Sequence, residues 1–168
     1  MNQEMRDAYT LWLCSLRGLG SASLYRLWKE SGEDPDFAGV WYRMAGEGGG
    51  AGMTNRLREI LRRGRKESSP QQLMEQLLNQ NIHFVWPGNP CYPVRLKNIP
   101  DPPFALYFRG RLPEEKQPSI GIVGTRMASP YGREQARRFA SELSAGGMQI
   151  ISGMAKGIDG IAGRGALD

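Results

Sequence analysis

Two glycine-containing loops that each carry a cation are the parts of this sequence best suited to chemistry. The first loop, "GTRMASP" at residues 124–130, contains Arg126, and the second, "SGMAKGID" at residues 152–159, contains Lys156. Glycine lets a backbone approach a ligand closely, and a helix that begins after such a loop offers unpaired N–H groups to an anion. Cations, hydroxyl groups and N–H groups in the two loops together predict a phosphate-binding site.

The elements expected around these loops form a β-α-β unit. The near-continuous apolar run at residues 119–125 is typical of a parallel strand that is covered on both faces. Ser129 suits a helix N-cap and Pro130 the first helical position, and Gly146 and Gly147 suit the end of that helix. A second strand is expected at residues 148–152, followed by a helix that begins near residues 157–159.

This arrangement predicts where the ligand binds. Ligands of open parallel sheets lie beyond the carboxyl ends of the strands, where the two loops would lie side by side. We therefore expect the two loops to form one pocket. Its predicted members are Gly124, Arg126, Ser129, Ser152, Gly153 and Lys156. Taken alone, Arg126 could instead pair with an acid across its turn, and Lys156 could be an ordinary exposed lysine.

The sequence favours holding a phosphate over breaking bonds. "GIVGTR" does not match the G-x-G-x-x-G dinucleotide pattern, and no P-loop motif is present. No acid–base pair or Ser–His–Asp arrangement is evident, and the single histidine, His83, lies outside both loops. Cys14 and Cys91 lack metal-ligand spacing and are expected to be reduced thiols. We expect no catalytic residue, no metal site and no cofactor.

The segment before residue 69 is expected to be a small helical domain. Helices are predicted at residues 4–16, from residues 21–23 onward and at residues 54–66, whereas residues 32–53 lack periodicity. Gly18 and Gly20 bracket a tight turn between the first two helices. In helix-hairpin-helix modules such glycines bring the backbone close to a phosphate, although a plain helical corner is the simpler interpretation. The arginine-rich third helix is either a solvated face, which we slightly favour, or a basic patch that tracks a nucleic-acid backbone.

The motif "ESSP" at residues 67–70 marks the expected domain boundary, because Ser69 can cap a helix that begins at Pro70. The predicted domains are residues 1–68, all-α, and residues 69–168, which contain the parallel sheet. Strands are also expected in "NIHFVWPG" and "ALYF". The five prolines between residues 90 and 103 predict an extended connection without helix.

Composition sets broader limits on function. The chain has 168 residues and a net charge of +5, a mild basic bias that suits a nucleic-acid partner. No apolar run approaches the length that spans a bilayer, and the N-terminus lacks the features of a signal peptide. A soluble cytoplasmic protein without a membrane partner is therefore expected.

Three motifs in order resemble the DNA-processing protein A family, also called DprA or Smf: "YPVRLKNIPDPPFALYFRG" (92–110), "IVGTRMASPYG" (122–132) and "ISGMAKGIDGIAGRGAL" (151–167). "LRGLGSASLYRLW" more weakly resembles the family's helical domain, which is sterile-alpha-motif-like or helix-hairpin-helix. The resemblance implies an extended Rossmann-like α/β fold and a role that is not enzymatic. That role would be to bind and protect single-stranded DNA during natural transformation and to help load the RecA recombinase onto it. Carried over by position, the family's phosphate pocket falls on Gly124, Arg126, Ser152, Gly153 and Lys156.

Two departures from the family pattern accompany this resemblance. Gly163 stands where the family usually has histidine, which puts any role of that side chain in question. Residues 118–168 are also too few for a complete doubly wound sheet. We therefore expect a truncated chain that lacks the later strands, which in the family carry the dimer interface and the RecA-contacting surface. Homodimerisation and RecA loading by this chain itself are then in question, and a sheet edge and apolar helix faces should be exposed.

Other functions remain open on the sequence. The main alternative is a nucleotide-processing Rossmann enzyme, such as a phosphoribohydrolase of the LOG type, although the second loop lacks the "GGG" typical of that class. A purely structural module would leave the two loops unexplained. Tyr131 could stack on a base or, as is more usual for such a tyrosine, pack against the sheet.

Overall fold

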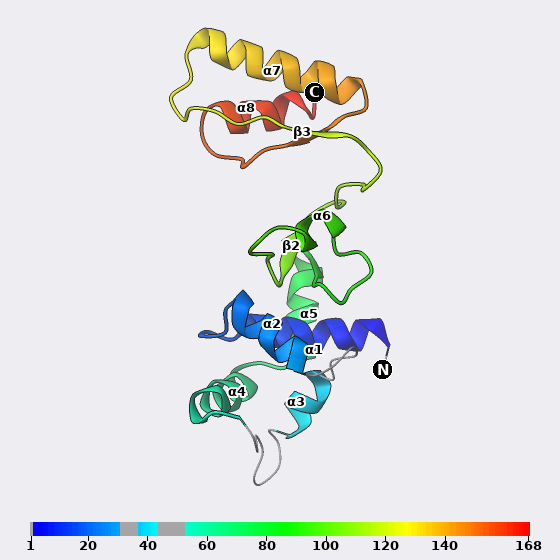
Figure 1. The fold of residues 1–168 in the computed structure, drawn as a ribbon, viewed down its shortest axis with the longest axis vertical. Helices are drawn as coiled ribbons and strands as arrows, with labels where there is room; N and C mark the ends of the chain where they lie inside the picture. Colours follow the sequence, from blue (N-terminus) through cyan, green and yellow to red (C-terminus); the bar gives the residue numbers. More distant parts are fainter. Residues whose placement is uncertain (1, 31–36, 44–52) are drawn as a thin grey trace. The chain divides into compact units, whose positions relative to one another are not determined.

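A computed structural model of the chain describes residues 2–30, 37–43 and 53–168 (Figure 1). The chain divides into two compact units, Met1–Leu112 and Pro113–Asp168. The first unit is mainly helical and contains one antiparallel strand pair, and the second combines helices with a parallel strand pair. This is the α/β architecture expected from the sequence, with a helical N-terminal part and a parallel strand pair.

The first unit consists of short helices around an antiparallel strand pair. The strands are β1 (His83–Val85) and β2 (Leu106–Phe108), with Phe84 opposite Tyr107. The helices are α1 (Gln3–Ser15), α2 (Ser21–Glu30), α3 (Phe37–Arg43), α4 (Asn55–Glu67), α5 (Pro70–Asn79) and α6 (Val94–Lys97). Ser69 caps α5 in a reciprocal pair of hydrogen bonds with Gln72, and Pro70 occupies the first helical position, as the motif predicts.

Two segments of this unit differ from the expectation. Helix α3 lies in the segment 32–53, where no helix was expected. The one-turn helix α6 follows Pro93 within the proline-rich connection, because a proline just before a helix removes no hydrogen bond from it. The glycine-rich stretch at residues 44–52 lies outside the described residues.

An aromatic core joins the N-terminal helices to the antiparallel strand pair. Trp12 in α1 is completely buried and meets Trp41 edge-on, with ring centroids 4.7 Å apart. Trp86 and Phe104, which flank β1 and β2, are buried in the same core. The Asp7 carboxylate of α1 accepts hydrogen bonds from Trp86 Nε1 at 2.6 Å and from the Asn89 side-chain amide at 3.0 Å. The first compact unit thus extends past residue 68, and the domain boundary expected there stays a prediction.

The second unit is the predicted β-α-β motif. Strand β3 (Ser119–Gly121) pairs in parallel with β4 (Gln149–Ile151), and each is shorter than the apolar run that predicted it. Helix α7 (Pro130–Ala145) connects them, and α8 (Ile158–Gly165) follows β4. The two helices pack closely: a Cβ added at Gly165 would lie 2.6 Å from the carbonyl oxygen of Arg137. Several large apolar side chains of the unit are exposed. Phe139 of α7 is one, as expected of an apolar helix face, and Val123, Met127 and Leu167 lie outside the helices and strands.

Two further features concern the chain as a whole. Among the described helices, none has both the length and the apolar character needed to cross a bilayer. Cys14 and Cys91 are free thiols, as expected. Burial raises the pKa of the Cys14 thiol to about 12, so this cysteine stays protonated and unreactive near neutral pH.

Candidate phosphate-binding site

The two predicted loops are in direct backbone contact. The N–H group of Ile158 donates to the carbonyl oxygen of Thr125 at 3.2 Å. Gly157 has φ +88°, and a Cβ at this position would lie 2.2 Å from that oxygen and 2.6 Å from the carbonyl oxygen of Arg126. Only glycine allows this approach. The loop after β3 and the loop after β4 therefore meet at the carboxyl ends of the strands, as the sequence predicts.

Asp159 fastens the two loops together. It is buried in the first turn of α8, and its Oδ1 accepts a hydrogen bond from the N–H of Gly124 at 3.1 Å. A Cβ at Gly153 would lie 3.0 Å from Oδ2, so the second loop also passes close to the same carboxylate. The Ser152 hydroxyl donates to the carbonyl oxygen of Asp159 at 3.3 Å.

Asp159 was not expected from the sequence to be a site residue. An acid in the first turn of a helix that follows a glycine loop is a common stabilising feature, and that position was the available signal. The structure gives two predicted residues contacts within the protein, and their contact with a phosphate stays a prediction. Gly124 directs its N–H to Asp159 and packs against Ile158, and Ser152 braces the second loop with its hydroxyl proton.

The two cations of the loops are available to a ligand. Arg126 and Lys156 are both exposed, and within the part of the chain that the structure describes neither side chain has a hydrogen bond or an ion pair. The simpler interpretation of Arg126, pairing with an acid across its turn, finds no support among these residues. The backbone contact at residues 126 and 157 brings the two cation-bearing loops to one edge of the sheet.

The remaining predicted residues of this unit lie at the start of α7. Ser129 caps the helix, its hydroxyl oxygen accepting a hydrogen bond from the N–H of Gly132 at 3.1 Å, while the hydroxyl group itself stays exposed. Tyr131 is 72% exposed in the first turn of α7. It does not pack against the sheet, and its stacking on a base stays a prediction.

The predicted tight turn at Gly18 and Gly20, between α1 and α2, belongs to the first unit. Gly18 has φ +99°, and a Cβ there would lie 3.2 Å from Cδ1 of Ile60 in α4. Gly20 has open space around it. The turn between α1 and α2 is thus a helical corner packed on α4, and its contact with nucleic acid stays a prediction. In α4, Arg65 lies over the Trp41 ring at 4.8 Å and Arg63 pairs with Glu67 at 3.3 Å, so part of the arginine-rich face serves packing and local pairing.

Comparisons with known proteins show which family the segment with both loops resembles. The family model described as DNA recombination-mediator protein A matches residues 83–168, which include both loops. Protein Smf of Synechocystis sp. is 38% identical over 99 residues, covering 56% of this chain and 25% of its own length. Protein Smf of Borreliella burgdorferi is 46% identical over 72 residues, covering 43% of this chain and 23% of its own length. DNA processing protein DprA of Bacillus subtilis is 38% identical over 84 residues, covering 49% and 28%.

The fold is also similar to a solved structure. The X-ray structure of DNA processing protein A from Streptococcus pneumoniae matches with a TM-score of 0.67 and 23% identity, covering 95% of this chain and 53% of that one. This chain spans about a quarter of the length of the curated relatives that it matches.

Proposed function

We propose, because the chain belongs to the DNA recombination-mediator protein A family, that it binds single-stranded DNA without sequence preference at the contact between its two cation-bearing loops. The observation that carries the proposal is the approach of Gly157 to the Arg126 backbone, which unites loops that are separated in the sequence by a strand and a helix. Both cations are exposed, and neither forms an ion pair with an acid among the described residues.

The proposed mechanism relies on the DNA backbone. Arg126 binds a phosphate through its planar fork of donors, and Lys156 adds a second positive charge. The exposed hydroxyl of Ser129 and the N–H groups near the start of α7 complete the donor set. Contacts to phosphate carry no base information, so the mode of binding is independent of sequence. Tyr131, exposed beside this loop, offers a face on which a base can stack.

The wider role in this proposal follows from the family. The protein would act in the cytoplasm and protect DNA that enters during natural transformation. Loading of RecA and homodimerisation are expected of the family and are not assigned to this chain itself. A binding role, without catalysis, is proposed for the chain itself. The loops supply donors for an anion, and no catalytic pair has been identified in them.

The test is the variant Arg126→Ala. Its affinity for an oligothymidylate should fall by roughly 1–3 kcal/mol, because a charge-assisted hydrogen bond to phosphate is removed. The slope of log affinity against log salt should also become shallower by roughly 0.7. Fluorescence anisotropy titrations at two salt concentrations measure both quantities.

Arg138→Ala is the matched control, because Arg138 is an exposed arginine of α7 that pairs with Glu142 at 3.8 Å. Unchanged affinity and salt slope in a folded Arg126→Ala protein would contradict the proposal. A competition titration with double-stranded DNA measures the preference for single strands.

The enzyme alternative has a separate assay. A phosphoribohydrolase would release free base from nucleoside monophosphates, which chromatography of the reaction mixture detects. We expect no base release above the background of a protein-free mixture.

A further inference from the structure

A groove of about 630 Å³ runs between α7 and α8 of the second unit. It is lined by Pro130, Arg133, Glu134, Arg137, Ile161, Arg164 and Asp168. Three of these seven residues are arginines, and none of them belongs to the pocket predicted from the sequence.

The arginines of the groove differ in what they contact. Arg137 is committed to Asp168, whose Oδ2 accepts from Nε at 2.8 Å and lies 2.7 Å from a terminal nitrogen. The side chain of Arg164 makes no hydrogen bond or ion pair within the described residues. Arg133 uses only its Nε, which donates to a backbone carbonyl at 3.1 Å and leaves its two terminal nitrogens available.

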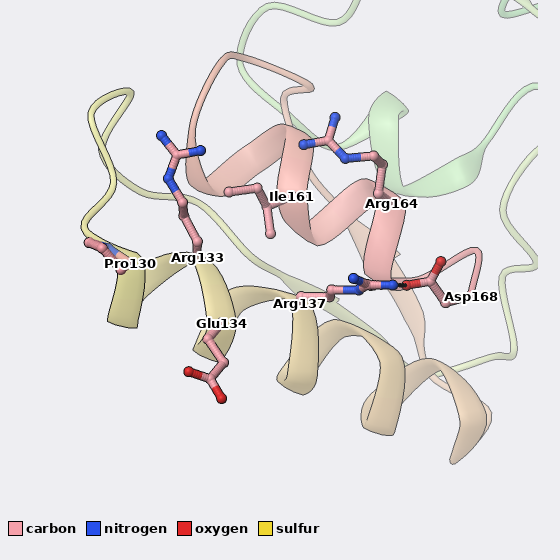
Figure 2. Close-up of a pocket in the computed structure, with 7 residues that line it drawn as sticks. All are labelled: Pro130, Arg133, Glu134, Arg137, Ile161, Arg164 and Asp168. Atoms are coloured by element: carbon pink, nitrogen blue, oxygen red, sulfur yellow. Dashed lines mark hydrogen bonds and ion pairs between the residues drawn. The ribbon is translucent and has the colours of Figure 1, made fainter.

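Two of these side chains place positive charge on both flanks of Ile161 in the groove, Arg133 from α7 and Arg164 from α8. Figure 2 shows the guanidinium groups of Arg133 and Arg164 on either side of Ile161, whereas Arg137 turns toward Asp168 and Glu134 points away. Ile161 is buried between them and forms an apolar floor. Two guanidinium groups with unused donors beside an apolar floor suit a strand that has phosphates on one side and bases on the other.

The groove is connected to the phosphate loop. The carbonyl oxygen that accepts from Arg133 Nε belongs to Ala128, two residues after Arg126. Pro130 of the groove directly follows Ser129 of the loop. A strand held at the loop can therefore continue along the surface toward Arg133 and Arg164.

We propose that this groove is a second phosphate subsite, in which Arg133 and Arg164 bind the backbone of the same single strand beyond the phosphate held by Arg126. The proposal rests on the proposed function, because the strand enters from the loop. In this arrangement Arg133 and Arg164 bind phosphates of the DNA backbone, and the strand runs from the loop into the groove.

The test compares Arg164→Ala, and the double variant Arg133→Ala/Arg164→Ala, with the unchanged 168-residue chain. Oligothymidylates of about 4 and about 16 nucleotides, the range of site sizes known for single-strand-binding OB-folds, serve as short and long probes. For the long probe, the double variant should bind roughly ten-fold more weakly, and its salt slope should be shallower by roughly 0.7 for each phosphate that the groove no longer binds. For the short probe, which the loop alone can hold, affinity should change by less than about two-fold.

Arg138→Ala removes one positive charge from α7, the helix of Arg133, at a position outside the groove, and should leave both affinities near those of the unchanged chain. Arg164→Ala removes no hydrogen bond of the described structure, so it keeps the test valid if the double variant fails to fold. By itself it should weaken binding of the long probe. Equal weakening in the groove variants and in Arg138→Ala, or unchanged binding of the long probe, would overturn the subsite. If Arg126→Ala binds both probes weakly and the groove variants bind only the long probe weakly, both proposals are supported. An unaffected Arg126→Ala protein overturns the loop proposal whatever the groove variants do.

Discussion

Gly157 is the residue on which the contact between the two loops depends most directly. Its φ of +88° lies where residues with a Cβ are strained, and its ψ of −132° takes it outside the ordinary left-handed region. The predicted pocket includes neighbouring glycines but not this one. The sequence indicates a turn here, but it does not reveal that a carbonyl group from the other loop fills the space of the missing side chain.

We predict that Gly157→Ala destabilises the second unit by roughly 1–3 kcal/mol, because backbone strain adds to a clash with Thr125 and Arg126. Single-strand binding should weaken along with it, since the loops separate. Urea denaturation followed by circular dichroism measures the free energy of unfolding. Gly121→Ala is the matched control, because Gly121 lacks a positive φ and has nothing within 4 Å of an added Cβ. Equal stability of the two variants would show that the close approach is unimportant.

At the scale of elements, helix caps are the features that the sequence predicts best. Ser69 before Pro70 and Ser129 before Pro130 both start helices where expected, because capping depends on residues within one turn. Helix α3 was missed because its seven residues are too few for a clear period, and tertiary contacts such as Trp41 on Trp12 stabilise it. Strands β3 and β4 were expected to be longer. A run of apolar residues indicates burial, but it does not show where the hydrogen bonds between two strands end.

The capping box of α5 provides a prediction at this scale. Ser69→Ala should lower the free energy of unfolding by about 1 kcal/mol, because the N–H of Gln72 loses its acceptor at the start of the helix. The midpoint of chemical denaturation measures this change. Ser68→Ala is a neighbouring control, since the Ser68 backbone ends α4 and its side chain has no hydrogen bond among the described residues. A Ser69→Ala protein as stable as this control would contradict the role of the cap.

For the whole molecule, the division into two compact units predicts where a protease cuts first. Arg111 and Lys116 are exposed on either side of the boundary at Leu112–Pro113. Limited trypsin digestion should therefore release fragments that end or begin near these residues before it cuts inside α1 or α7. Mass spectrometry of early time points identifies the fragments. Early cleavage within α7, for example after Arg138, would argue against the second unit being compact, and Arg111→Gln/Lys116→Gln should slow the first cut.

The carboxylate of Asp7 has a consequence for anyone who trims this protein to its recognisable part. The matched segment begins at residue 83, yet the indole of Trp86 and the amide of Asn89 both find their acceptor in the first helix. A fragment that begins there would keep both cation-bearing loops. It would leave the Trp86 indole N–H and the Asn89 amide without their acceptor and would expose the aromatic side chains that pack on the first helix. Helix α1 completes the core around β1 and β2, so the segment before residue 83 and the matched segment have to be expressed together.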